Sequence, residues 1–348
     1  MNTTFLKGAD ISFVDEIESE GGAYFENGQR RDVLDILKDS GINSARLRLW
    51  NEPAFDYNNL AKTLKMARRI KDKGLHFLLD FHYSDYWADP GKQTMPKAWA
   101  GLAHDEIADA LRRFTCDAVQ KLKEQGTPPD MVQIGNEITN GMVWNDGRVD
   151  GEWDTDEQWR KLADLIEAGV RGVEDAMDGP GQVPIMIHID RGGDNKGSRS
   201  FYDRLSSMNV EYDMIGLSYY SWWHGTLEEL RHNLDDLAER YGKDIVIVEA
   251  AYPWTMTPPD EQPLIFNRED WLYPGYPASP EGQAAWLRNL MDVIRATPGN
   301  RGKGIYYWEP CWIPSKPHWS VGHENNWSNL TLFSYSGNKL PSLDAFKE

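Results

Sequence analysis

The sequence predicts a (β/α)8 barrel, the TIM-barrel form of the α/β class, built by residues 1–348 as a single domain. Apolar segments of strand length alternate with amphipathic helical segments about eight times, which is the succession that this barrel requires. The strand segments are continuously apolar, as is typical of a parallel sheet buried on both faces. Long, aromatic-rich segments follow the strands, whereas short ones precede them, and the functional loops of such a barrel follow its strands.

The individual elements are recognised from hydrophobic periodicity. Apolar side chains spaced by three and four residues indicate the helices, and glycines such as Gly41, Gly74 and Gly242 end them. Rows of β-branched and other apolar residues indicate the strands. The expected strands, in order, cover residues 5–11, 43–50, 75–82, 131–135, 183–189, 214–219, 245–250 and 304–308. The expected helices cover residues 30–38, 60–73, 107–125, 159–176, 201–208, 227–241 and 282–296.

A doubly wound open sheet is the alternative architecture for the same alternation of elements. Such a sheet usually carries a glycine-rich phosphate-binding turn after an early strand. The chain contains neither a G-x-G-x-x-G motif nor a P-loop, so the closed barrel is favoured.

The composition limits the classes of partner. The formal net charge is −18, from 37 basic and 55 acidic residues, so neither nucleic acid nor an anionic membrane is an expected partner. No apolar run approaches the ~20 residues that a membrane helix needs. Tryptophan and tyrosine number 15 each, and their flat faces suit sugar rings, so carbohydrate is a candidate ligand. We expect a monomer.

Cysteine usage and the first residues bear on cofactors and compartment. Cys116 and Cys311 are far apart in the sequence, so they indicate neither a disulfide framework nor a zinc site. No cofactor and no metal are predicted. Met1 is not followed by the charged and apolar regions of a signal peptide. As written, the chain is expected in the cytoplasm, and it would be extracellular if its start had replaced a signal peptide.

Two glutamates stand where apolar strands end. Residues 131–135 lead to Glu137, and four β-branched residues run directly into Glu249. Acidic side chains are rarely buried without a partner, so a pair that faces one cleft explains them better than two separate salt bridges at a sheet edge. Two carboxyl groups across a cleft suit glycoside hydrolysis, in which one protonates the leaving oxygen and the other attacks the anomeric carbon or activates water.

Further polar and aromatic residues at the strand ends are candidates for the same cleft. Arg46 or Arg48 is expected near Glu249, where an arginine would favour the ionised carboxylate. The amide of Asn136 and the ring of His82 could bind sugar hydroxyls, and Trp308 could form the floor of the site. For the arginines and the histidine, salt bridges or hydrogen bonds between strands are the alternative explanation.

Several motifs are long and unusual. They include Ala45-Arg-Leu-Arg-Leu-Trp-Asn51, Leu79-Asp-Phe-His-Tyr-Ser-Asp85, Gln133-Ile-Gly-Asn-Glu-Ile138, Ser218-Tyr-Tyr220 and Val248-Glu-Ala-Ala-Tyr-Pro253. With these motifs the chain resembles the family 53 glycoside hydrolases, the endo-β-1,4-galactanases, over nearly its whole length. The resemblance implies hydrolysis of internal β-1,4-galactosidic bonds in galactan, type I arabinogalactan or derived oligosaccharides, by a double displacement that retains the anomeric configuration.

The resemblance also implies residue roles. Glu137 is expected to be the general acid/base and Glu249 the nucleophile, with their carboxyl groups ~5–5.5 Å apart. Tyr220 is expected to steady the nucleophile, and Tyr219 stays as the alternative because adjacent strand residues face opposite ways. The expected substrate-binding residues are Arg46, His82, Asp85, Trp87, Asn136, His188, Tyr219, Tyr220 and Trp308.

The chain departs from the family pattern after its seventh strand. Bacterial members often carry a calcium-binding loop there, rich in Asp, His, Asn and Gly, and residues 255–263 lack that pattern. We therefore expect no structural calcium. A disulfide in the last loop, as in fungal members, lacks nearby cysteines. The preferred product length stays open.

Other functions also stay open. The chain could be another β-glycosidase of the same clan, acting on mannan, glucan or short galactosides, or an intracellular hydrolase of galacto-oligosaccharides. A sugar-binding barrel without activity is disfavoured because both glutamates are present. A metal-dependent barrel hydrolase lacks the expected His-x-His and His-Glu-x-x-His motifs. Its possible ligands would be His82, His188, Asp190, His224 and His323.

Overall fold

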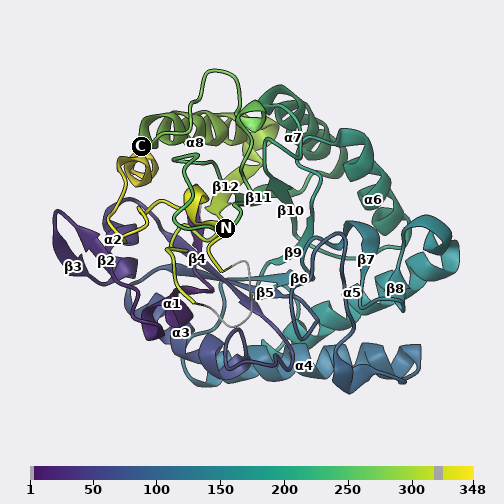
Figure 1. Ribbon diagram of the computed structural model, residues 1–348. Helices are drawn as coiled ribbons and strands as arrows, with labels where there is room; N and C mark the ends of the chain where they lie inside the picture. The colour runs from purple at the N-terminus through teal and green to yellow at the C-terminus, as the bar shows by residue number, and fades with distance from the viewer. Residues whose placement is uncertain (1–3, 317–323) are drawn as a thin grey trace.

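The computed structural model describes residues 4–316 and 324–348, and their centre is a closed barrel of eight parallel strands (Figure 1). Neighbouring strands around the barrel follow the order β1-β12-β11-β10-β9-β6-β5-β4, so each pairs with its neighbours in the chain and β1 closes the ring on β12. The strands are β1 Leu6–Asp10, β4 Ser44–Leu49, β5 His76–Phe81, β6 Met131–Ile134, β9 Ile185–Ile189, β10 Met214–Tyr219, β11 Asp244–Ala250 and β12 Gly302–Tyr307. The predicted (β/α)8 fold is confirmed.

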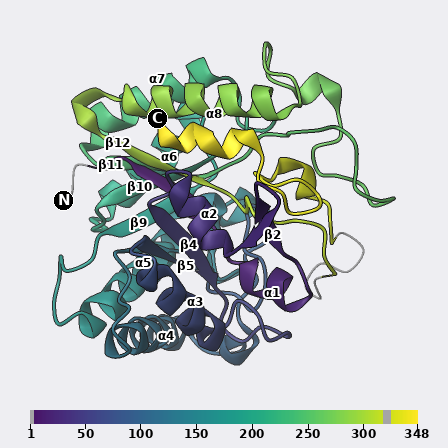
Figure 2. The same cartoon turned by 90° about the vertical axis from the view of Figure 1, so that its left-hand side faces the viewer.

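Helices surround the barrel (Figures 1 and 2). They are α1 Val14–Ser19, α2 Val33–Asp39, α3 Leu60–Asp72, α4 His104–Glu124, α5 Asp156–Ala176, α6 Asn195–Ser207, α7 Leu227–Tyr241 and α8 Pro280–Arg295. After β12, the 3-10 helix Pro341–Lys347 lies against α8, as Figure 2 shows. The Lys7 ammonium donates hydrogen bonds to the carbonyls of Phe346 and Glu348, both at 2.6 Å, so this last helix is tied to the first strand.

The barrel interior has an apolar layer and a polar layer. Alternate residues of a strand point inward, so one strand can contribute to both layers. The apolar layer of the interior is a cluster of Leu78, Met131, Met186, Met214, Val246, Val248 and Tyr306. Two positions further along β5, β6 and β9 stand Asp80, Gln133 and His188, all fully buried. The polar layer therefore lies at the carboxyl ends of the strands, below the loops that follow them.

A few elements differ from the sequence prediction. Helix α6 begins at Asn195 rather than at residue 201, because the Asp194 side chain accepts a hydrogen bond from the Gly197 backbone N–H and starts the helix in a polar stretch. Two small hairpins also lacked a periodic signal, since their strands have two or three residues each. They pair β2 Tyr24–Glu26 with β3 Gln29–Arg31, and β7 Gly141–Met142 with β8 Gly147–Arg148.

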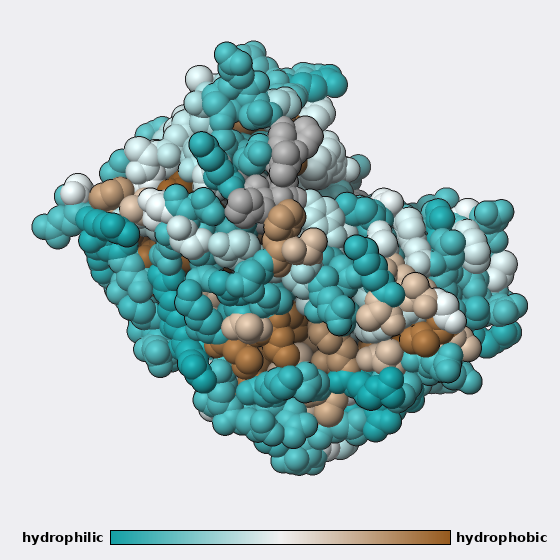
Figure 3. Space-filling model, turned by 60° about the horizontal axis from the view of Figure 1, so that its bottom comes forward, coloured by the Kyte–Doolittle hydropathy of each residue, from teal (hydrophilic) through white to brown (hydrophobic). Residues whose placement is uncertain are grey.

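One face of the molecule is mainly polar. Figure 3 shows a mostly hydrophilic face on which hydrophobic residues gather in one central area and a few small patches. None of the helices in residues 4–316 and 324–348 is long and apolar enough to cross a membrane.

Candidate active site

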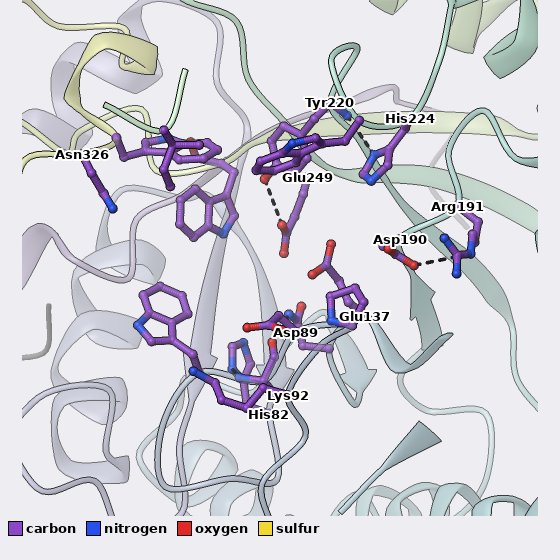
Figure 4. A pocket seen from close by; sticks show the side chains of 18 of the residues that line it. His82, Asp89, Lys92, Glu137, Asp190, Arg191, Tyr220, His224, Glu249 and Asn326 are labelled. Atoms are coloured by element: carbon purple, nitrogen blue, oxygen red, sulfur yellow. Dashed lines mark hydrogen bonds and ion pairs between the residues drawn. The ribbon is translucent and has the colours of Figure 1, made fainter. Parts of the chain in front are cut away.

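A cavity of about 580 Å³ opens at the carboxyl ends of the strands, and both Glu137 and Glu249 line it. The two carboxyl groups point toward one another from opposite sides (Figure 4). One side of the cavity is aromatic, with Trp87, Trp308, Trp312 and Trp327 among its lining residues. The other side is polar, with Asp190, Arg191 and His224.

Glu137 reaches the cavity through an unusual backbone conformation. It lies three residues beyond the end of β6. Its φ of +47° and ψ of +48° are in the left-handed region, which residues other than glycine rarely occupy. Its backbone N–H donates to His188 Nδ1 at 3.3 Å. Its Oε1 accepts a hydrogen bond from the Ser218 hydroxyl at 2.6 Å, and that hydroxyl lies 2.9 Å from His188 Nε2. His188 Nδ1 also lies 3.0 Å from Asn136 Oδ1, so both ring nitrogens of this buried histidine contact the groups around Glu137.

Glu249 lies one residue before the end of β11 and has two strong donors. Its Oε1 accepts from the Arg46 guanidinium at 2.9 Å, and its Oε2 accepts from the Tyr220 hydroxyl at 3.0 Å. Arg46 is only 1% exposed and also pairs with Asp10 at 2.9 Å and with Asp80 at 2.8 Å. One buried guanidinium thus fixes the position of Glu249 against the floor of the barrel.

These surroundings separate the pKa values of the two glutamates. Burial is the largest influence on Glu137 and raises its pKa well above the ordinary value, and the charges of Glu249 and Asp190 raise it further. Burial also raises the pKa of Glu249, but Arg46 and the Tyr220 hydroxyl oppose that rise, and the pKa is about 7. Glu249 therefore loses its proton first, and the pair can hold one protonated and one ionised carboxyl group at the same pH.

Residues 6–346 match the protein family described as "Glycosyl hydrolase family 53". The chain belongs to glycosyl hydrolase family 53. This membership makes the protein a glycoside hydrolase, as the paired glutamates predicted.

Similar proteins cover the whole barrel. A Niallia circulans protein named "Uncharacterized protein in bgaB 5'region" is 56% identical over 99% of this chain and 93% of its own length. The arabinogalactan endo-beta-1,4-galactanase of Cellvibrio japonicus is 35% identical, with 99% of this chain and 91% of its own length covered. The solved family 53 catalytic domain of Ignisphaera aggregans is 38% identical, covers 100% of this chain and 96% of its own, and has a TM-score of 0.92.

Most of the predicted site residues of this family 53 hydrolase lie in or under the cavity. His82, Trp87, Asn136, Tyr220 and Trp308 line it. Arg46 and His188 lie directly below, where they hold the catalytic candidates rather than face the opening. Between the two arginines proposed for Glu249, the structure places Arg46 there, while Arg48 pairs with Glu309 at 2.7 Å.

Besides Arg46 and His188, which lie below the cavity, two further predicted substrate-binding residues, Asp85 and Tyr219, do not line it. The Asp85 carboxylate accepts hydrogen bonds from the backbone N–H groups of Glu52 and Lys97, both at 2.9 Å, so it braces two loops. Tyr219 points to the outside of the barrel, where its ring stacks on Trp286 of α8 and its hydroxyl donates to the Gly225 carbonyl at 2.9 Å. Adjacent strand residues face opposite ways, so an inward Tyr220 requires an outward Tyr219.

The sequence reasoning missed several lining residues on the polar side. Asp190 and Arg191 directly follow β9, in the same kind of position from which Glu137 follows β6, and that placement was the available signal. The sequence suggests Asp190 and His224 only as possible metal ligands. His323 lies outside the described residues. Within residues 4–316 and 324–348, no group of three or more His, Cys, Asp or Glu side chains is arranged to hold a metal ion.

Proposed function

We propose that this family 53 hydrolase cleaves internal β-1,4-galactosidic bonds in galactan, type I arabinogalactan or derived oligosaccharides, with Glu137 as general acid/base and Glu249 as nucleophile. The two roles are assigned from the contrast between the hydrogen-bond partners of Glu249 and those of Glu137. Glu249 accepts from a buried arginine and a tyrosine, which favour its ionised form, whereas Glu137 has one serine hydroxyl and negative neighbours. The family and its galactanase members support the substrate.

The two steps of a retaining mechanism follow from these protonation states. In the first step the ionised Glu249 attacks the anomeric carbon while the protonated Glu137 gives its proton to the leaving oxygen. In the second step the ionised Glu137 takes a proton from water, whose oxygen bonds to the anomeric carbon as the bond from that carbon to the Glu249 carboxylate breaks. The aromatic side chains of the cavity supply flat faces on which sugar rings can stack.

Product analysis tests the substrate. We would incubate the protein with linear β-1,4-galactan and with galactotetraose, using mannan and cellulose as controls, and follow the products by chromatography over time. Mid-length products from the polymer would support an endo-galactanase. Cleavage of the tetramer alone would favour an enzyme that trims oligosaccharides, and cleavage of mannan or cellulose instead would refute the galactoside assignment. The anomer released first, read by proton NMR, tests retention.

The catalytic roles have their own control. Glu249→Ala should abolish turnover of galactotetraose, because no other carboxylate of the described residues combines the contacts to Arg46 and Tyr220. The control is Asp85→Ala, which removes a carboxylate that braces loops without lining the cavity, so turnover should be retained. Near-wild-type activity in Glu249→Ala would contradict the assignment of the nucleophile.

A further inference from the structure

A second buried arginine lies behind the aromatic side of the cavity. Arg48 is on β4, two residues after Arg46, and is 1% exposed. It does not line the cavity. Its Nη2 donates to Glu309 Oε1 at 2.7 Å, and its Nη1 lies 3.9 Å from Asp10 Oδ1. Two buried carboxylates therefore lie beside the guanidinium.

The faces of the same guanidinium are covered by aromatic rings. Its central carbon lies 3.8 Å from the ring centroid of Phe13 and 4.4 Å from that of Trp87. A cation within ~6 Å of a ring centroid is attracted to the ring, and the attraction grows when water is excluded. Trp87 lines the cavity, so Arg48 connects a wall of the cleft to the charged groups buried behind it.

The partner carboxylate ties this arrangement to a second wall residue. Glu309 is fully buried and follows Trp308, whose ring lies 5.8 Å from that of Trp87. Glu309 has φ +46°, a left-handed conformation that must be held by its surroundings. A buried ion pair is weak grounds for stability, since apolar residues of similar size often serve as well. The presence of the Arg48–Glu309 pair is better explained by a role in fixing the positions of the Trp87 and Trp308 indoles.

We propose that Arg48, paired with Glu309, is a positioning residue that holds the Trp87 indole in place as a sugar-stacking wall of the cleft. The proposal rests on the proposed function in so far as the substrate is a sugar chain. Arg48 touches neither Glu137 nor Glu249 in any contact of the described residues, so its loss should act on substrate affinity more than on the chemical step.

A double-mutant cycle between Arg48 and Trp87 tests this role. Arg48→Met keeps the apolar stem and removes the cation, and we expect it to raise KM for galactotetraose about tenfold while kcat changes less than about threefold. Trp87→Ala should raise KM at least as much. If Arg48 acts through the indole, adding Arg48→Met to Trp87→Ala should change KM by less than about twofold. Independent effects that multiply in the double variant would overturn the proposal, as would an unchanged KM in Arg48→Met.

Two further variants separate positioning from general loss of structure. Arg69→Met removes another arginine held by two carboxylates, Glu18 and Asp32, away from the cleft, and should leave KM unchanged. Arg48→Met combined with Glu309→Met replaces the whole ion pair by apolar side chains, which avoids a lone buried charge. This folded double variant should still show the raised KM, and a wild-type KM in it would overturn the proposal.

A spectroscopic measurement keeps the inference separate from the substrate assignment. In protein labelled with 5-fluorotryptophan, the ¹⁹F resonance of Trp87 can be assigned by its loss in Trp87→Phe. We expect this resonance to broaden or split in Arg48→Met and to stay narrow in Arg69→Met. An unchanged resonance in Arg48→Met would overturn the positioning role. If the wild type cleaved no galactotetraose, the proposed function would fail, while this measurement would still decide on Arg48.

Discussion

Replacing Tyr220 by phenylalanine removes one of the two donors to Glu249 and leaves the ring in place. The hydroxyl lies 3.0 Å from Glu249 Oε2 and the ring is buried, so no bulk water can substitute fully for the lost hydrogen bond. A hydrogen bond to a charged group contributes about 1.5–3 kcal/mol. At 1.36 kcal/mol per pKa unit, its loss should raise the pKa of Glu249 by about 1–2 units.

The direction of the effect on activity follows from the role of Glu249. The nucleophile must be ionised, so kcat/KM falls as the pH drops through its pKa, which is about 7 in the intact site. A higher pKa in Tyr220→Phe moves this acid limb to higher pH by about 1–2 units. The assay is the pH profile of kcat/KM on galactotetraose for the wild type and the variant.

The neighbouring tyrosine supplies the matched control. Tyr219→Phe removes a hydroxyl that donates to the Gly225 carbonyl outside the cavity, so its acid limb should coincide with that of the wild type. An acid limb that stays in place or moves to lower pH in Tyr220→Phe would refute the reasoning. Equal shifts in both variants would point to a general change of the barrel instead.

Three further predictions concern the carboxyl groups. Glu137→Ala should lower kcat/KM on galactotetraose by about 10²–10⁴-fold, and azide should restore turnover of an aryl galactoside by attacking the glycosyl–enzyme in place of water; no azide effect would contradict the acid/base role. Asp190→Asn removes a charge that raises the pKa of Glu137, so the alkaline limb of the pH profile should move to lower pH, and a shift to higher pH would contradict this. The folded-state pKa of Glu249, about 7, is raised above the ordinary 4.5, so its contribution to stability is complete below about pH 4.5 and is lost as the pH rises through 7. Glu249→Gln should therefore be more stable than the wild type by up to about 3 kcal/mol at about pH 8 and equally stable near pH 4, as measured by urea unfolding.

The fold and the two glutamates were predictable because both leave local signals in the sequence. Most strands of this barrel are short, largely apolar runs, and each barrel strand is followed in the chain by the barrel strand beside it. Glu137 and Glu249 break such runs at the end where parallel strands carry functional groups. The arginine beside Glu249 could be narrowed to Arg46 or Arg48, because alternate residues of a strand share one face. The choice between these two required the strand pairing in space.

The remaining site residues depend on side-chain directions and loop paths that no local pattern contains. Asp85 lies in a motif with Trp87, yet Trp87 faces the cavity while Asp85 binds two backbone N–H groups. Glu309 and Arg48 are 261 positions apart, and only the closed barrel brings them together. Arg191 resembles any surface arginine until the barrel places it beside the cavity.

The left-handed backbone at Glu137 has a consequence for directed evolution. This conformation costs a residue with a side chain roughly 1–2 kcal/mol compared with glycine, and the buried carboxyl group adds a further cost of desolvation. At this position, therefore, sequences that fold better are sequences that cannot catalyse. A library selected for heat resistance alone should accumulate glycine at residue 137, so every round of thermal selection on this scaffold needs a screen for turnover beside it.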